Sequence, residues 1–408
     1  MVCKQQYILI STMILLCLQS LVSAQWLETT ITVGDSPNAL VYNSTNNKVY
    51  CANWGSDDVT VIDGVTNSVI TTITVGDDPL TSVYNSTNNK VYCANVSSGN
   101  VTVIDGATNS VLITITVGSY PHALVYNSTD NKVYCANGGT GNVTVIDGAT
   151  NSVITTVTVG DDPWALLYNP TDNKVYCANR GSDDVTVIDG VTNSVITTIT
   201  VGDEPLPLVY NSTDNKVYCA NGGSDNVTVI DGVTNSVITT ITVGDDPRTL
   251  VYNTTNNKVY CANGGSDDVT VIDGASNSVI TTITVGSWPR AFAWNPVQNR
   301  TYVVNYNGAS VSVIRDVTGI EVGQKHNVTR LILSISPNPT KTFFTIDSPT
   351  PVRLIRIYDV FGNLVRTEDM TQYENRTTIS VRTMSAGIYF LQVNAANTEF
   401  IKKLIVTK

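Results

Sequence analysis

The residues best suited to chemistry are six cysteines that recur every 42 residues, always within the hexapeptide KVYCAN. Thiols at a fixed spacing could form disulfides, bind a metal ion, or pack as small apolar groups. Histidine, which often joins cysteine in metal and nucleophilic sites, occurs only as His122 and His326. The repeated positions are Cys51, Cys93, Cys135, Cys177, Cys219 and Cys261.

The cysteines belong to a repeated unit with four short β-runs, which in the first copy read NALVYN, KVYCAN, DVTVID and SVITTITVG. We name these runs strands A to D. Turn-forming segments separate them, and no part of the array has the apolar spacing of a helix. A seventh, altered copy has Val303 in the cysteine position. Four antiparallel strands in about 42 residues are typical of a β-propeller blade.

The strand count predicts how the ring closes. Strands A to C occur seven times, but the seventh copy ends at SVSVIRD and lacks a strand D. An orphan strand D, WLETTITVG, precedes the first strand A at Trp26–Gly34. We therefore expect an all-β, seven-bladed β-propeller whose N-terminal strand completes the last blade. The alternative is an open solenoid, which would need capping repeats and would leave the orphan strand unpaired.

This architecture decides between the roles of the cysteines. Equivalent positions in neighbouring blades lie one sheet-to-sheet step apart, roughly 10 Å, whereas a disulfide needs Cα atoms within about 4.4–6.8 Å. A zinc site gathers its sulfurs at about 2.3 Å from one ion. We therefore predict neither disulfides between blades nor a metal site. Each cysteine should pack between blades, where Val303 keeps the volume and loses the thiol.

The unit KVYCANRGSDDVTVIDGVTNSVITTITVG resembles the YVTN family of β-propeller repeats, with YCAN where that family has YVTN or YVAN. The resemblance extends over residues 25–316. It implies a seven-bladed propeller that is usually exported or held at a cell surface, and it implies no single chemistry.

Residues 1–24 predict export. They combine Lys4, an apolar run from about Tyr7 to Val22, and small residues before Gln25, as in a cleavable signal peptide. The run is short for a membrane anchor, and no second run approaches membrane length. The formal net charge of −11 argues against a nucleic-acid partner, which needs a basic face.

The C-terminal part differs in charge and pattern. Residues 331–408 carry a net charge of +3, against −15 for residues 25–330. We predict a linker at 317–330 and a small β-sandwich at 331–408. The segments IYDVFGNLV, GIYFLQV and KKLIVTK resemble the C-terminal sorting domain of the type IX secretion system. This resemblance implies a partner in that machinery, passage through the outer membrane, and then release or surface attachment. An ordinary immunoglobulin-like appendage is the alternative. The matching positions are Pro337, Asn338, Pro339, Gly362, Gly387, Lys402 and Lys403.

Several other chemistries are not expected. Neither histidine lies in a nucleophile-elbow context, and the inner strands are nearly uniform, whereas propeller enzymes place unlike polar residues at their channel. We predict no enzyme activity and no cofactor. The repeated GSDD and GDDP acids could suggest calcium, but we favour a turn-forming acidic rim. The NST and NVT triplets match the N-glycosylation sequon. They are numerous because the repeat recurs, so they are weak evidence for glycosylation.

The copies differ mainly at two places. The A–B and C–D turns barely change. The residue after the proline that starts strand A varies freely, and so does the residue after CAN. Tyr120 and Trp288 also interrupt a mostly acidic or small position before that proline. In order of copies, the first position holds Asn38, Leu80, His122, Trp164, Leu206, Arg248 and Arg290, and the second holds Trp54, Val96, Gly138, Arg180, Gly222, Gly264 and Tyr306.

These variable positions predict a binding face. In an up-and-down blade the D–A and B–C connections share one face of the disc, and loops on a rigid scaffold often carry recognition. Aromatic residues and arginine are enriched in binding hot spots. We predict a surface or extracellular scaffold that binds a protein or glycan. The alternatives are neutral drift of these loops, a structural surface-layer component, and a lactonase- or lyase-like enzyme. The candidate residues are Trp54, Tyr120, His122, Trp164, Arg180, Arg248, Trp288, Arg290 and Tyr306.

Overall fold

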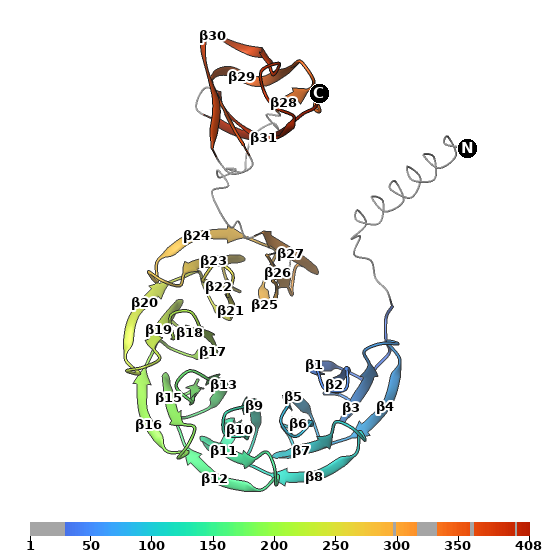
Figure 1. The fold of residues 1–408 in the computed structure, drawn as a ribbon. Helices are drawn as coiled ribbons and strands as arrows, with labels where there is room; N and C mark the ends of the chain where they lie inside the picture. Colours follow the sequence, from blue (N-terminus) through green and yellow to red (C-terminus); the bar gives the residue numbers. More distant parts are fainter. Residues whose placement is uncertain (1–28, 297–298, 316–332, 360–362, 396–397) are drawn as a thin grey trace, which may run out of the picture. The chain divides into compact units, whose positions relative to one another are not determined.

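The computed structural model describes residues 29–296, 299–315, 333–359, 363–395 and 398–408 (Figure 1). The chain forms two compact units, Met1–Asp316 and Val317–Lys408, which are treated separately below. The predicted signal peptide and the whole of the predicted linker lie outside the described residues.

The first unit consists of antiparallel sheets whose strands follow one another in chain order, as predicted. The first sheet contains β1 (Pro37–Asn43), β2 (Lys48–Asn53), β3 (Asp58–Asp63) and β4 (Val69–Thr74). A short 3-10 turn, η1 (Gly138–Thr140), interrupts the third sheet's B–C loop. The remaining sheets are β5 (Pro79–Asn85), β6 (Lys90–Asn95), β7 (Asn100–Asp105) and β8 (Val111–Thr116); β9 (Pro121–Asn127), β10 (Lys132–Asn137), β11 (Asn142–Asp147) and β12 (Val153–Thr158); β13 (Pro163–Asn169), β14 (Lys174–Asn179), β15 (Asp184–Asp189) and β16 (Val195–Thr200); β17 (Pro205–Asn211), β18 (Lys216–Asn221), β19 (Asn226–Asp231) and β20 (Val237–Thr242); β21 (Pro247–Asn253), β22 (Lys258–Asn263), β23 (Asp268–Asp273) and β24 (Val279–Thr284); and β25 (Pro289–Asn295), β26 (Arg300–Asn305) and β27 (Ser310–Arg315).

Each sheet packs face to face on the next one around the arc of Figure 1, with strand A innermost and strand D outermost. Between the third and fourth sheets, Tyr134 and Val145 meet Val175, Cys177 and Ile188 in one buried apolar cluster. Alternation along each strand sends one set of side chains to the preceding blade and the other set to the following blade. The core is therefore a series of similar interfaces rather than one central cluster.

The cysteines pack in these interfaces, which confirms their predicted role. All six of those described are unpaired and buried. The Cys177 Sγ donates to Asn179 Oδ1 at 3.3 Å within its own strand. Burial raises the pKa of the Cys93 thiol to about 12. A thiol held neutral inside an apolar interface has little nucleophilic or metal-binding capacity.

Polar side chains connect each blade to the next at the A–B and C–D turns. Lys132 Nζ donates to Gly190 O at 2.6 Å, Val191 O at 2.9 Å and Asn193 Oδ1 at 3.0 Å, all in the following blade. Tyr134 donates to the same Asn193 Oδ1 at 2.9 Å. The same lysine contacts are made by Lys48, Lys90, Lys174 and Lys216.

The A–B turn is uniform for the same reason. Asn127 is fully buried, and its Oδ1 accepts from the backbone N–H groups of Thr129 and Asp130. Its Nδ2 donates to Asn173 Oδ1 of the next blade at 2.8 Å. This side-chain nitrogen is also the atom to which a glycan would be attached in the NST sequon. Because it is buried and bonded to the next blade, a glycan there is incompatible with the folded blade. The invariance of the turn thus reflects contacts between blades as well as turn chemistry.

The C–D turns are fixed by aspartates. Asp147 Oδ1 accepts from the backbone N–H groups of Ala149 at 2.9 Å and Thr150 at 2.7 Å. The hydrogen bond from Thr150 is the largest cause of the lowered pKa of this carboxyl group. Asn151 completes the turn with φ of 61°, a left-handed conformation that asparagine tolerates better than most residues.

The predicted closure by the N-terminal strand is not formed within the described part of the chain, and this corrects the expectation. The seventh sheet has three strands, and residues 29–33 have no strand pairing. In Figure 1 the first and seventh sheets stand at opposite ends of an open arc. Ile31 and Val33 line a hollow on the first sheet instead, beside Cys51 and Ile62. Residues 29–33 lie beside the first blade, whereas the unpaired edge of β27 lies on the other side of the gap between the first and seventh sheets. The two segments are therefore not neighbours and form no strand pair.

The two end blades consequently expose apolar side chains that their copies bury. Leu40 is 69% exposed on the first blade, and Val311 and Val313 are 56% and 53% exposed on the seventh. The equivalent Val101 and Val103 of the second blade are fully buried.

The second unit, predicted as a small β-sandwich, is a small all-β domain whose five strands form a single bent sheet. They are β28 (Ser334–Ser336), β29 (Phe343–Tyr358), β30 (Leu364–Ser380), β31 (Gly387–Ala395) and β32 (Thr398–Val406). Register shifts near Val352 interrupt the pairing of the long strand β29 with both neighbours. The sheet encloses one apolar core that includes Phe344, Ile357 and Leu404.

No helix long and apolar enough to cross a membrane occurs in the described ranges.

Replacing Cys177 by valine should change the free energy of unfolding by less than about 1.5 kcal/mol, because the apolar volume is nearly kept. Cys177→Ser should cost about 1–3 kcal/mol, because a hydroxyl is costlier to desolvate than a thiol even with Asn179 Oδ1 in reach as an acceptor. Urea unfolding of both variants checks this. A larger loss for valine than for serine would show that the thiol makes a specific interaction.

Candidate functional site

The two variable positions lie side by side in each blade, on the face made by the D–A and B–C loops. The residue after CAN donates its backbone N–H to the carbonyl of the residue before the strand A proline. The distance is 2.9 Å for Arg180 to Asp162 and 2.9 Å for Tyr306 to Trp288. The opposite turns are linked in the same way, as in Gly190 N to Asn173 O at 2.9 Å. Variable loops and invariant turns therefore occupy separate ends of the blades.

Three predicted residues come together across the third and fourth blades, and we name them the Trp164 cluster: His122, Trp164 and Arg180. The rings of His122 and Trp164 lie 4.5 Å apart at an interplanar angle of 34°. The Arg180 guanidinium lies 5.2 Å from the centre of the Trp164 ring, within range of a cation–π interaction.

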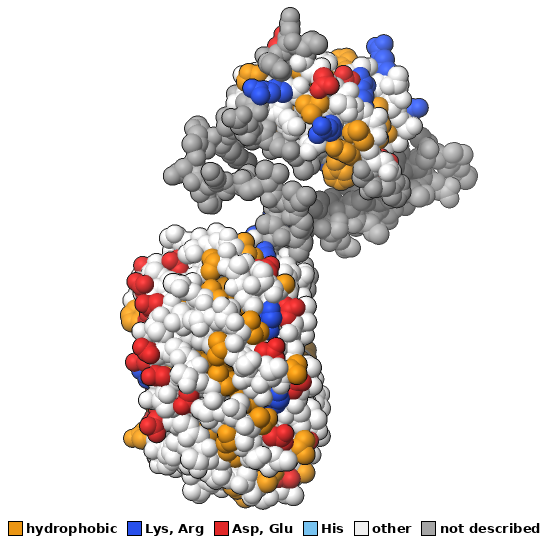
Figure 2. All heavy atoms as spheres, turned by 90° about the vertical axis from the view of Figure 1, so that its left-hand side faces the viewer, with side chains coloured by type: hydrophobic (Ala, Val, Ile, Leu, Met, Phe, Trp, Pro, Cys, Tyr) orange, Lys and Arg blue, Asp and Glu red, His pale blue; other side chains and the backbone are white. Residues whose placement is uncertain are grey.

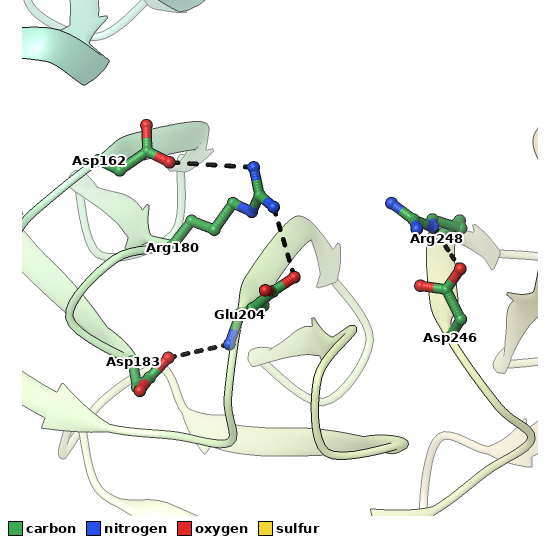
Figure 3. A network of polar contacts seen from close by, with 6 residues as sticks. All are labelled: Asp162, Arg180, Asp183, Glu204, Asp246 and Arg248. Atoms are coloured by element: carbon green, nitrogen blue, oxygen red, sulfur yellow. Dashed lines mark hydrogen bonds and ion pairs between the residues drawn. The ribbon is translucent and has the colours of Figure 1, made fainter.

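Acidic residues hold this arginine in place (Figure 3). Arg180 lies 3.4 Å from Glu204 Oε2 and 4.0 Å from Asp162 Oδ2. The backbone N–H of Glu204 donates to Asp183 Oδ1 at 2.9 Å, which fixes the loop that carries Glu204. Both ion pairs are more than a third exposed, so they orient the guanidinium more than they stabilise the fold.

The imidazole of His122 is partly buried in this cluster. Burial lowers the pKa of its imidazole, Asp162 opposes this effect, and Arg180 adds to it. Its Nδ1 atom is buried and has no hydrogen-bond partner among the described residues. The ring lies against Gly138, where an added Cβ would come within 2.5 Å of His122 Cδ2. The glycine after CAN in this copy therefore makes room for the histidine.

A second group, which we name the Trp288 cluster, spans the sixth and seventh blades and consists of Arg248, Trp288, Arg290 and Tyr306. The Trp288 and Tyr306 rings meet edge to face at 6.3 Å, and the Arg290 guanidinium lies 5.4 Å from the Tyr306 ring centre. Arg248 Nε donates to Asp246 Oδ2 at 2.7 Å (Figure 3).

Gly264 plays the same part in this cluster as Gly138 in the first. A Cβ on Gly264 would lie 2.9 Å from Trp288 Nε1 and 3.2 Å from Arg248 Cγ. In these two blades a glycine after CAN leaves room for a large side chain from a D–A connection, whereas the fourth and seventh blades carry large residues at both variable positions. The sequence shows a glycine after CAN in both of these blades, next to a loop that carries a large residue. Because the two variable positions were considered separately, this steric pairing was not predicted.

Two predicted residues remain outside both clusters. Tyr120 is 56% exposed and lies over Gly139, where an added Cβ would meet its Cδ2 atom at 2.6 Å. Trp54 is half-buried in the first blade, and its backbone N–H donates to Ser36 O at 3.0 Å. The acidic partners Asp162, Glu204 and Asp246 were not predicted as site residues, because the repeat made them look like ordinary turn formers.

The position before the strand A proline has a backbone constraint in every copy. Its φ lies between 50° and 56° in all seven blades, which is the left-handed region. Aspartate tolerates this region and bulky side chains do not. Tyr120 and Trp288 nevertheless occupy it, at φ of 53° and 55°. Such strain persists where the surroundings hold it, and it is concentrated at functional sites.

The face therefore offers exposed aromatic rings, oriented guanidinium groups and an acidic border. In the described ranges no three His, Cys, Asp or Glu side chains are grouped as metal ligands.

The sorting motifs lie in the second unit. The Asn338 side chain, between Pro337 and Pro339, donates to Lys403 O at 2.7 Å and accepts from Ile405 N at 2.8 Å. It thereby pairs with the edge of β32 as a strand would. Gly387 begins β31, Lys402 and Lys403 lie on β32, and Gly362 falls outside the described residues.

Comparison with known proteins agrees with this architecture. Residues 334–407 match the secretion system C-terminal sorting domain, which indicates type IX secretion and attachment at the outer surface. No curated protein matches the chain.

Solved structures share the fold. One is from Kuenenia stuttgartiensis hydrazine synthase, with 18% identity and a TM-score of 0.54, covering 72% of this chain and 99% of that one. Another is from a mitotic checkpoint complex, with 13% identity and a TM-score of 0.57, covering 72% and 96%. Residues 75–329 match the model of the YNCE-like beta-propeller. Because that match spans more than half of the chain's length, the chain belongs to the YNCE-like β-propeller family.

Proposed function

We propose that this exported propeller is a binding or adhesion scaffold that recognises a protein or glycan through its D–A/B–C loop face. The observation that carries the proposal is the strained backbone at Tyr120 and Trp288. Neutral drift at this position would favour residues that tolerate the left-handed region, as the aspartates of three copies do, Asp78, Asp162 and Asp246. Two exposed aromatic residues kept there against a conformational cost favour selection for contact with a partner.

The chemistry of the face suits such a partner. Tyr306 is 63% exposed and Trp288 is 39% exposed, so their rings are free to stack on a sugar or an apolar side chain. Arg290 lies beside them and has no carboxylate partner among the described residues. A planar guanidinium of this kind gives bidentate contacts to carboxylates and carbonyls.

The rigidity of the scaffold supports the same role. Hydrogen bonds between blades fix the turns at the opposite end, as the contacts of Lys132 and Asn127 illustrate. Side chains presented by a rigid frame lose less conformational entropy on binding than those on free loops. We expect no enzymatic activity, because neither cluster combines a nucleophile with a base.

A second candidate, a structural surface-layer component, is favoured by a different observation. Adjacent apolar residues on each outer strand are exposed, for example Val195 and Ile196 at 41% and 42%. A register shift at that point of the β15–β16 pairing turns both side chains outward. Figure 2 shows apolar side chains as a band along the rim of the propeller. Such a band could pack discs side by side.

The binding proposal is tested by the double variant Trp164→Ala/Arg290→Ala, which truncates one residue of each cluster. Hits from a glycan array and from pull-downs with purified surface proteins would be titrated directly against purified protein. We expect at least a tenfold loss of affinity, since hot-spot truncations cost about 2 kcal/mol or more. The matched control is Val191→Ala/Val233→Ala on the opposite face, where other copies carry alanine. Unchanged binding by the first variant would overturn the assignment.

The strain argument has its own test. Tyr120→Asn should raise the free energy of unfolding by roughly 1 kcal/mol, because asparagine relieves the left-handed strain. Tyr120→Phe should leave the free energy of unfolding unchanged, because phenylalanine is as strained as tyrosine in the left-handed region. Urea denaturation compares the three proteins. A loss of stability in Tyr120→Asn would mean that the tyrosine is retained for packing.

The surface-layer candidate predicts lateral assembly. Replacing Ile154, Ile196 and Ile238 by threonine should abolish ordered arrays in electron micrographs of cell envelopes, because the apolar band is interrupted on three neighbouring blades. Envelopes that show no arrays with the unaltered protein would remove this candidate and leave the binding role unaffected.

A further inference from the structure

The second unit exposes an apolar row on the face of its sheet that points away from the core. Leu364, Tyr358, Phe390 and Lys403 pair directly across β30, β29, β31 and β32. Residues paired in this way project from the same face of a sheet. Leu364 is 55% exposed and Phe390 is 42% exposed. Ile388, two residues before Phe390 and 41% exposed, extends the row.

The row gathers residues from sequence segments that lie far apart. Tyr358 and Leu364 flank the first hairpin, Ile388 and Phe390 belong to GIYFLQV, and Lys403 belongs to the closing KKLIVTK. The alternate positions of these strands, such as Ile357, Leu391 and Leu404, fill the core. Core packing therefore explains only half of the residues in these motifs, and the other half converge on one outer face.

The position of β32 in this row is held by the Pro337–Pro339 segment. The Asn338 side chain makes two hydrogen bonds to the backbone of Lys403 and Ile405. Thr340 N also donates to Ile405 O at 2.9 Å, and Thr407 N donates to Thr340 O at 2.8 Å. The first motif of the domain thus fixes the strand that completes the row.

The charges beside the row indicate the chemistry of its partner. Lys403 stands in the row and Arg356 lies two residues before Tyr358 on the same face. Neither has a carboxylate partner within the described part of the chain, and residues 331–408 carry a net charge of +3. An apolar strip beside unpaired cations fits a protein surface with an apolar recess bordered by carboxylates.

We propose that this outer row, formed by Tyr358, Leu364, Ile388, Phe390 and Lys403, is the surface by which the type IX secretion machinery recognises the sorting domain. The occupant is a receptor protein of that machinery with an apolar, acid-bordered recess. The match to a sorting domain requires such a partner, and the row joins the segments that carry the match. This inference is independent of what the propeller binds.

The test expresses the full chain in a bacterium with a type IX system and measures the fraction that reaches the outer surface. Leu364→Ser/Phe390→Ser should lower that fraction at least tenfold and leave folded protein in the periplasm. Lys403→Glu should lower it as well, because it reverses the charge beside the row. The matched control is Phe343→Ser, which removes a phenylalanine of similar exposure, 50%, at the other end of β29.

Thermal unfolding and circular dichroism of each purified variant establish that the second unit is folded. Normal surface delivery of the folded double variant would overturn the proposal. Equal losses for the double variant and for Phe343→Ser would also overturn it, because the row would then have no special role. A dimer of the unaltered chain that dissociates in the double variant, with delivery unchanged, would assign the row to self-association instead.

Discussion

The propeller depends on the interface that each blade makes with the next. Its apolar part packs tyrosine and valine from one blade against valine, cysteine and isoleucine from the following one. Its polar part carries the Lys132 ammonium group and the Asn127 side chain across the boundary to turns of the next blade. These groups are buried or half-buried, so losing a partner would leave an unsatisfied charge or amide. This requirement explains why the turns at that end of the blades hardly vary.

The same constraint leaves the other end of the blades free to differ. The D–A and B–C loops are joined by backbone hydrogen bonds, such as Arg180 N to Asp162 O, which place no demand on the side chains. Steric fit then limits the side chains there, as shown by His122 over Gly138 and Trp288 over Gly264, while the position before the proline also keeps a left-handed φ in every copy. Two groups of unlike residues could therefore arise on a nearly symmetric frame without disturbing its core.

The second unit follows a different logic. Its five strands form one bent sheet around a single core, and its motifs serve both that core and an outer row. The Asn338 side chain substitutes for a missing strand at the edge of β32. A domain matched to secretion sorting is thus attached to a propeller whose candidate binding face is built entirely within its own blades.

The sequence alone determined the four-stranded blades, the separation of variable and invariant loops, and the packing role of Cys177, because a 42-residue repeat fixes the alternation of every strand. Only the tertiary structure decided which variable residues meet. Trp164 reaches His122 of the preceding blade, whereas Tyr120 and Trp54 stand apart. It also revealed the left-handed φ of Tyr120 and the open arc between the end blades. Contacts between blades and backbone torsions depend on positions in space, which spacing along the chain does not specify.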